Sequence, residues 1–381
     1  MNVPVRSLYI HIPFCGSKCF YCDFNSYVSS ETVMERYTDA LCKELTMIAQ
    51  TDSALPLRTV FFGGGTPTLL PPRLLEKILQ TLHQFYSIEA DAEITMEANP
   101  GSVDSDTLRI IKEHGVNRLS FGVQSFDDTM LHSLGRLHDR NTVYRSFEMA
   151  RKAGFYSINL DLMFGLPDQT LELLEDSVSQ LLMLAPEHVS VYGLKIEAGT
   201  PFAKWYDAGH LQLPPEHAEV AMYEFVQQSL ADHGYEQYEI SNFAKHGHKS
   251  RHNIVYWRNE PYLAAGAGAH GYVGGRRYAN IKRLDPYMEE LEAEKRPIES
   301  VESISVEMEQ EDTMMLGLRL AEGVTYDRFF TRHGVAMQEV FGSVIQDFAG
   351  KGLLEVDESG VRLRRSAYIV GNEVFAGFID I

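Results

Sequence analysis

The sequence is short of cysteine, of basic residues and of long apolar runs. Four cysteines in 381 residues, with no N-terminal stretch typical of a signal peptide, do not indicate the disulfide framework of a secreted protein. No segment approaches the roughly 18 consecutive apolar residues that a membrane-spanning helix needs. Lys and Arg number 34 against 53 Asp and Glu, and the net charge of −19 argues against a nucleic-acid-binding surface. We therefore expect a globular chain in a reducing cytoplasm that binds no nucleic acid.

Three of the four cysteines lie close together. Cys15, Cys19 and Cys22 fall in the run HIPFCGSKCFYCDF, directly after the short apolar segment SLYIHIPF. Three thiolates with the spacing C-x3-C-x2-C on one tight loop can hold three irons of a [4Fe–4S] cluster, for which four cysteines are the usual number. The fourth iron then keeps an open position, as catalytic metal sites do. That position can chelate the amino and carboxylate groups of S-adenosylmethionine (SAM).

Other interpretations of these cysteines stay open. His11 lies four residues before Cys15, and the pattern H-x3-C-x3-C-x2-C is a formal Cys3His zinc site. A disulfide is a weaker alternative in a chain with so few cysteines. The fourth cysteine, Cys42, falls in VMERYTDALCKELTMIA, whose spacing predicts an amphipathic helix. We expect Cys42 to be a small core residue and not a cluster ligand.

The first half of the chain alternates between apolar segments and segments with helical spacing. Strand–helix alternation of this kind predicts parallel βαβ units, and the continuous apolar runs suit strands that are buried on both faces. Six units, taken with the family resemblance given below, favour an α/β fold with a partial (β/α)6 barrel over a closed eight-stranded barrel. The six expected strands cover 7–12, 58–64, 93–99, 118–124, 157–165 and 188–196.

The polar residues of these units share one position. The cysteines follow the first strand and GGGTPT (63–68) follows the second, while Glu97 and Gln124 close the third and fourth and Asp161 belongs to the fifth. Chemistry collects at the carboxyl ends of the strands in α/β barrels and open α/β sheets. The sequence therefore predicts one site at one end of the barrel.

The remainder of the chain has a different character. Residues 238–284 are rich in Gly, Asn and His with few periodic runs, which predicts a long irregular loop region followed by an acidic linker. From about residue 300, three helical segments and a hairpin that turns at 357–360 resemble a winged-helix-like module, although its mixed charge does not indicate DNA binding. We expect three parts: a barrel over 1–235, a loop region and linker over 236–300, and a C-terminal module over 301–381.

Several motifs resemble the oxygen-independent coproporphyrinogen III oxidase-like family of the radical SAM superfamily. They are YIHIPFC, YCDF, GGGTPT, EANPG, LSFGVQSF, GLP and the C-terminal module, and together they cover nearly the whole chain. The resemblance implies a SAM-ligated [4Fe–4S] cluster on Cys15, Cys19 and Cys22. Glycines allow close backbone approach, carboxylates suit an ammonium and ribose hydroxyls, and arginine suits a carboxylate. The SAM contacts that the resemblance implies are Gly64, Gly65, Thr66, Glu97, Gln124, Arg136 and Asp161, with Tyr9 stacking nearby.

Two branches of that family compete, and whether this chain is an enzyme stays open. The decarboxylating branch carries a further cysteine two residues after the third, where this chain has Phe24. That branch also has an N-terminal extension before the first strand, which we do not find here. Both differences count against oxidative decarboxylation of coproporphyrinogen III. A heme-modifying radical enzyme is a third alternative that no residue favours.

The other branch is that of the heme chaperones, whose hallmark is an HNxxYW motif. This chain has His252 and Asn253 followed by Tyr256 and Trp257. Imidazole is a standard axial ligand of heme iron, and the two aromatic rings offer flat apolar faces to a macrocycle. His270, His246 and His248 are weaker candidates for the iron ligand.

That resemblance implies heme binding in the loop region. It also implies delivery to heme-accepting membrane proteins such as respiratory enzymes. It is compatible with a homodimer, and with a cytoplasmic protein that attaches to the inner face of the membrane.

Overall fold

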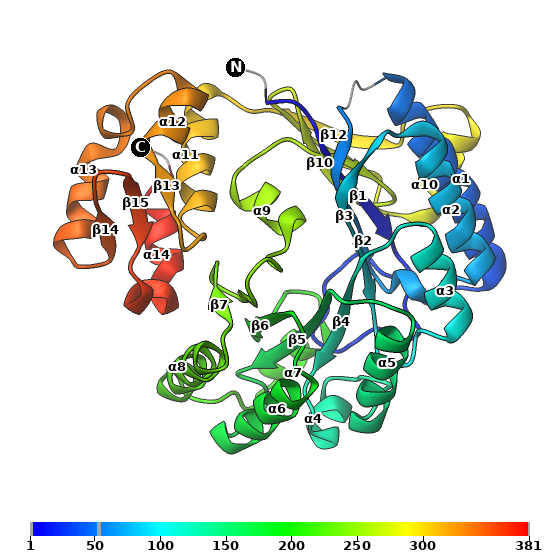
Figure 1. Ribbon diagram of the computed structural model, residues 1–381, viewed down its shortest axis with the longest axis horizontal. Coiled ribbons are helices and arrows are strands. Elements are labelled where there is room, and N and C mark those ends of the chain that lie inside the picture. The colour runs from blue at the N-terminus through cyan, green and yellow to red at the C-terminus, as the bar shows by residue number, and fades with distance from the viewer. Residues whose placement is uncertain (1–2, 52–54, 380–381) are drawn as a thin grey trace.

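The computed structural model describes residues 3–51 and 55–379, and its centre is one curved sheet (Figure 1). The sheet has nine strands in the order β7-β8-β6-β5-β4-β3-β2-β1-β9, and its middle six strands are parallel. The fold is thus the expected partial (β/α)6 barrel. The six strands are β1 (Ser7–Ile12), β2 (Leu57–Gly64), β3 (Ile88–Ala98), β4 (Arg118–Gln124), β5 (Ile158–Phe164) and β6 (His188–Gly193).

Helices cover the convex side of this sheet (Figure 1). They form where the sequence has helical apolar spacing: in α2, for example, Leu74, Ile78 and Leu82 are buried on one face. Several begin at a capping side chain, as where Asp104 accepts a hydrogen bond from the backbone N–H of Thr107 at 2.7 Å. The helical elements before β7 are α1 (Glu31–Thr51), η1 (Pro67–Leu69), α2 (Pro72–Phe85), α3 (Ser105–Glu113), α4 (Asp128–Ser133), α5 (Arg140–Lys152), α6 (Leu171–Leu184), α7 (Pro201–Asp207) and α8 (Glu216–Asp232).

The segment 236–300, expected to be irregular, contains regular elements that extend the barrel sheet. β8 pairs antiparallel with β6, whereas β9 pairs parallel with β1. The expected acidic linker is a helix followed by a strand. The elements are β7 (Glu236–Gln237), β8 (Asn242–Ala244), α9 (Arg251–Trp257), β9 (Leu263–Ala265), β10 (His270–Val273), β11 (Arg276–Asn280), α10 (Leu284–Glu292) and β12 (Ile298–Ser303). The strands β10, β11 and β12 form a second sheet.

The C-terminal part packs helices against a small antiparallel sheet of order β13-β15-β14. The expected hairpin is present, with the N–H of Asp357 donating to the carbonyl of Gly360 at 3.1 Å. Its elements are α11 (Val306–Gly317), β13 (Val324–Thr325), α12 (Tyr326–His333), α13 (Met337–Gly350), β14 (Leu354–Val356), β15 (Gly360–Leu363), η2 (Arg365–Val370) and α14 (Gly371–Ala376).

The parallel strands give the barrel two distinct ends. We call the end at which β1–β6 finish the mouth and the end at which they start the base. Figure 1 shows α9 inside the arc of strands, between the barrel and the C-terminal helices. Over the described ranges, no helix has the length and apolar character needed to cross a bilayer.

Candidate functional site

The three motif cysteines lie at the mouth and line one pocket. Cys15, Cys19 and Cys22 are all half-buried, and no other cysteine among the described residues lines that pocket. Within the described ranges, no three His, Cys, Asp or Glu side chains are close enough to hold a single metal ion. Three thiols from one loop fit a [4Fe–4S] cluster, whose irons take cysteine thiolates as ligands.

His11 is committed to other partners. Its Nε2 donates to the carbonyl of Asn25 at 2.9 Å, so its Nδ1 accepts from the hydroxyl of Tyr9 at 2.9 Å. Burial lowers the pKa of the imidazole. With both ring nitrogens occupied, His11 has no lone pair to offer a metal, which counts against the Cys3His alternative. Cys42 is buried in α1, as expected, with its Sγ 3.9 Å from the carbonyl of Lys77.

Two of the thiols have hydrogen-bond donors from the barrel wall. Thr66 Oγ1 donates to Cys15 Sγ at 3.8 Å, and Arg136 Nη1 donates to Cys19 Sγ at 3.4 Å. Hydrogen bonds to the sulfurs are one of the features by which a protein tunes an iron–sulfur cluster. Arg136, which we expected to contact SAM, thus also lies against the expected cluster.

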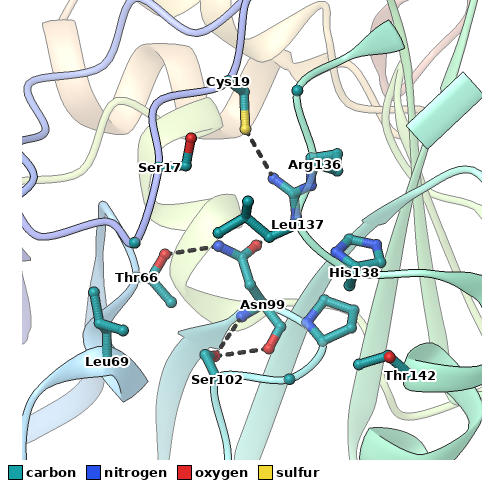
Figure 2. Close-up of a pocket in the computed structure, with 14 residues that line it drawn as sticks. Ser17, Cys19, Thr66, Leu69, Asn99, Ser102, Arg136, Leu137, His138 and Thr142 are labelled. Carbon is teal, nitrogen blue, oxygen red and sulfur yellow. Dashed lines mark hydrogen bonds between the residues drawn. The ribbon is translucent and has the colours of Figure 1, made fainter. Parts of the chain in front are cut away.

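Asn99 connects these donors, although it was not among the residues expected to contact SAM. The Nδ2 of Asn99 donates to Thr66 Oγ1 at 2.7 Å, a hydrogen bond drawn in Figure 2. The Oδ1 of Asn99 accepts from Arg136 Nη2 at 2.5 Å. The backbone N–H of Asn99 donates to Ser102 Oγ at 2.9 Å. These residues line a cavity of about 210 Å³ next to Cys19. The EANPG motif, in which Asn99 directly follows β3, was the available signal.

Two carboxylates face the same pocket as the cysteines. Burial and the nearby Asp161 raise the pKa of Glu97 to about 7, and burial also raises the pKa of Asp161. Glu97 Oε2 accepts the N–H of Gly64 at 3.0 Å, and Asp161 Oδ1 accepts from Asn159 Nδ2 at 2.6 Å. Two carboxylates this close repel each other when no ligand occupies the pocket, which costs free energy. A cationic ligand with hydroxyl groups would relieve that repulsion.

The glycine-rich segment packs tightly against the cluster loop. Gly64 has φ +109°, and a Cβ on it would lie 2.3 Å from the ring of His11. A Cβ on Gly65 would lie 2.6 Å from the carbonyl oxygen of Phe14. Gln124 has a positive φ of 71° despite its side chain, next to a register shift between β4 and β5. Strain of this kind is typical of functional positions.

The expected SAM residues are largely brought together. One pocket is lined by the cysteines and by Gly64, Gly65, Glu97, Gln124, Arg136 and Asp161. Thr66 lines the small cavity beside it, and Tyr9 lines a larger cavity that shares Gly64 and Glu97 with the pocket. The residues fit a cluster whose fourth iron faces SAM: three thiols, two carboxylates for an ammonium and a ribose, and an arginine for a carboxylate.

Replacing Glu97 with glutamine should stabilise the empty protein above pH 7. Because the pKa of Glu97 is raised in the folded protein, the ionised carboxyl destabilises the folded state. The free energy of unfolding of the wild type therefore falls as pH rises from about 4.5 to 7. Glutamine keeps the acceptor for the Gly64 N–H and removes the charge. We expect a gain of about 1–3 kcal/mol at pH 8 and little gain at pH 4.5, by urea denaturation of cluster-free protein. The exposed Glu224→Gln on α8 is the control, and equal gains at both pH values would contradict the interpretation.

The HNxxYW motif forms α9 at the base of the barrel, away from the cysteines. His252 is fully buried, and its ring stacks on Phe61 with centroids 5.2 Å apart. Thr59 Oγ1 donates its one proton to Ser7 Oγ, so it must accept the hydrogen bond from His252 Nδ1 at 2.8 Å. The other ring nitrogen, His252 Nε2, accepts from the hydroxyl of Tyr256 at 2.8 Å. Burial lowers the pKa of His252 to about 3. The imidazole is neutral and has no lone pair left over.

Tyr256 and Trp257 point to different surroundings. Tyr256 lines the larger cavity together with Tyr9, one helical turn from His252. The ring of Trp257 lies under the guanidinium of Arg319 at 4.5 Å, which joins α9 to the C-terminal part. The structure therefore does not bring His252, Tyr256 and Trp257 around one shared space.

Comparison with known proteins finds a family model for the barrel and another for the C-terminal part. The family model described as the radical SAM superfamily matches residues 9–181, and that of the HemN C-terminal domain matches residues 305–370. The "Heme chaperone HemW" of Bacillus subtilis is 44% identical over 376 residues, covering 98% of this chain and 99% of that protein. The protein of the same name from Lactococcus lactis is 37% identical, covering 98% and 97%.

A solved structure of coproporphyrinogen III oxidase (HemN) from Escherichia coli matches the fold. It is superposed with a TM-score of 0.87, covering 100% of this chain and 91% of that one. The sequences are 24% identical, so this match bears on the fold alone.

Proposed function

The chain belongs to the HemW type of the radical SAM superfamily, and from that premise we propose that it is a heme chaperone that also carries a SAM-ligated [4Fe–4S] cluster. Cys15, Cys19 and Cys22 hold the cluster. When bound, such a cluster supplies an electron to the sulfonium of SAM. The observation that carries the cluster assignment is the single pocket in which three thiols face Glu97 and Asp161.

The residues of the pocket divide the work of binding between them. Arg136 holds Cys19 and offers charge to the carboxylate of SAM, while Asn99 fixes the angle of that guanidinium. Glu97 and Asp161 take the ammonium and the ribose hydroxyls, and they lose their mutual repulsion when the cation binds. The cluster and SAM would then control when heme is held and released.

We further propose that heme is the cargo and that heme-dependent membrane proteins receive it. The names of the relatives support heme as the ligand. Phe24 in place of a further cysteine supports a role other than decarboxylation. The chaperone would work in the cytoplasm and meet its acceptors at the inner face of the membrane, as a monomer or a homodimer.

Three anaerobic assays on reconstituted protein test the chaperone against the oxidase. Added hemin should bind saturably, with a Soret band that persists through gel filtration. Coproporphyrinogen III with SAM and a reductant should yield no protoporphyrinogen IX. Heme-loaded protein mixed with membranes that contain a heme-free respiratory enzyme should lose its Soret band to the membranes. Turnover of coproporphyrinogen III without hemin binding would establish the oxidase instead.

A further inference from the structure

The larger cavity next to the cysteines has the shape and lining of a macrocycle site. Its volume is about 610 Å³, within the range of roughly 300–1,000 Å³ that small-molecule sites occupy. Tyr9, Tyr256 and Tyr262 supply aromatic surface inside it, with Tyr256 and Tyr262 edge to face at 4.7 Å between ring centroids. Through Gly64 and Glu97 it borders the pocket of the cysteines. A ligand here would lie beside SAM.

The opening of this cavity carries cations and one exposed imidazole. Lys18 and Lys282 are exposed at its rim, where they suit the two propionates of a heme. Phe24, which is 65% exposed, also lines the rim and offers an apolar face. His270 is exposed and lines the same cavity, and although its backbone pairs with β11, its ring makes no hydrogen bond to any residue that the structure describes. Its ring nitrogens are open to a metal.

The topology explains why His270 lies at the mouth. β9 runs parallel to β1, so the turn after β9 leaves the sheet at the same end as the cluster loop after β1. That turn leads directly to His270 at the start of β10. Asn25, just after Cys22, donates through Nδ2 to the carbonyl of Ala267 at 2.9 Å and to that of Lys282 at 3.0 Å. The cluster loop and the cavity rim are thus one connected unit.

We propose that heme occupies this cavity and that His270, not His252, is the axial ligand of its iron; the proposal rests on the heme-chaperone function given above. His252 would have to break two hydrogen bonds and leave its stack with Phe61 before it could reach an iron. In the structure it fixes the hydroxyl of Tyr256, and so acts as a positioning residue below the floor of the cavity. The HNxxYW motif would therefore shape the site, while another histidine binds the metal.

Titrations with hemin and with metal-free protoporphyrin IX test the assignment. His270→Gly should bind hemin at least about tenfold more weakly and lose the low-spin spectrum of a histidine-ligated heme, because the iron bond is gone. Added imidazole should restore that spectrum. Metal-free protoporphyrin IX should bind His270→Gly like the wild type, because only iron needs the ligand. His217→Ala, an exposed histidine on α8 outside the cavity, is the matched control and should bind hemin normally.

A second variant tests the cavity independently of the iron. The double change Lys18→Glu and Lys282→Glu should weaken hemin and metal-free protoporphyrin IX alike, and the dimethyl ester of protoporphyrin IX should be insensitive to it. A wild-type spectrum and affinity in His270→Gly, with loss of both in folded His252→Ala, would overturn the proposal and leave the chaperone function standing. If wild-type protein binds no hemin, the proposed function itself fails and the assignment with it.

Discussion

Replacing Cys19 with alanine will abolish the four-iron chromophore. A cluster with one open iron already depends on three thiolates, and two thiolates cannot hold three of its irons. The change also removes the sulfur that accepts from Arg136 at 3.4 Å, and so leaves a guanidinium beside an empty corner. After anaerobic reconstitution we expect no charge-transfer absorbance, sub-stoichiometric iron and sulfide, and no four-iron Mössbauer signal.

Cys42→Ala is the matched control for this experiment. Cys42 is buried in α1 and does not line the pocket of the other cysteines, so its loss should cost about 1 kcal/mol of stability and no iron. A complete cluster in Cys19→Ala would remove Cys19 from the ligand set. Tetrahedral zinc in wild-type protein would instead restore the Cys3His alternative, against the two hydrogen bonds of His11.

The barrel could be predicted because its signals are local. Each parallel strand is a continuous apolar run, and each following helix repeats apolar residues at helical spacing, as Leu74, Ile78 and Leu82 do. Polar residues at strand ends then converge by topology alone, which is why Glu97, Gln124 and Asp161 line one pocket with the cysteines. The sixth strand ends at Gly193, earlier than the apolar pattern suggested.

The segment 236–300 could not be predicted, because its structure depends on distant partners. β9 has three residues, and it is a strand because it pairs with β1, more than 250 residues earlier. The pattern HNIVYW gives a helix, but which face meets the barrel depends on Thr59 and Phe61 of β2. The position of His252 at the base was therefore not accessible from the motif.

Buried polar residues were also missed, since a single polar position in an amphipathic pattern gives no signal of its own. Glu44 lies in α1 among residues that the sequence suggests are simply helical, and it is fully buried. Its Oε2 accepts from the N–H of Gly266 at 2.7 Å and from the hydroxyl of Tyr287 at 2.6 Å, and its Oε1 accepts from Asn280 Nδ2 at 2.6 Å. It thus anchors the turn that leads from β9 to His270.

Glu44→Ala should lower the free energy of unfolding by about 3–5 kcal/mol, because three buried donors lose their acceptor at once. Glu44→Gln should cost about 1 kcal/mol, since one oxygen still accepts from Gly266 and Tyr287. Burial raises the pKa of Glu44, so the neutral amide is also spared the desolvation of a charge.

Urea denaturation would measure both Glu44 variants against Glu35→Ala. Glu35 lies on the same helix but forms an exposed ion pair with Arg73, and pairs of this kind contribute little to stability. Hydrogen exchange at the amides of Gly266 and Ala267 should accelerate in Glu44→Ala and stay slow in Glu35→Ala. If Glu44→Ala were as stable as Glu35→Ala, the turn before His270 would be held by its own backbone, and the rim of the cavity would not depend on α1.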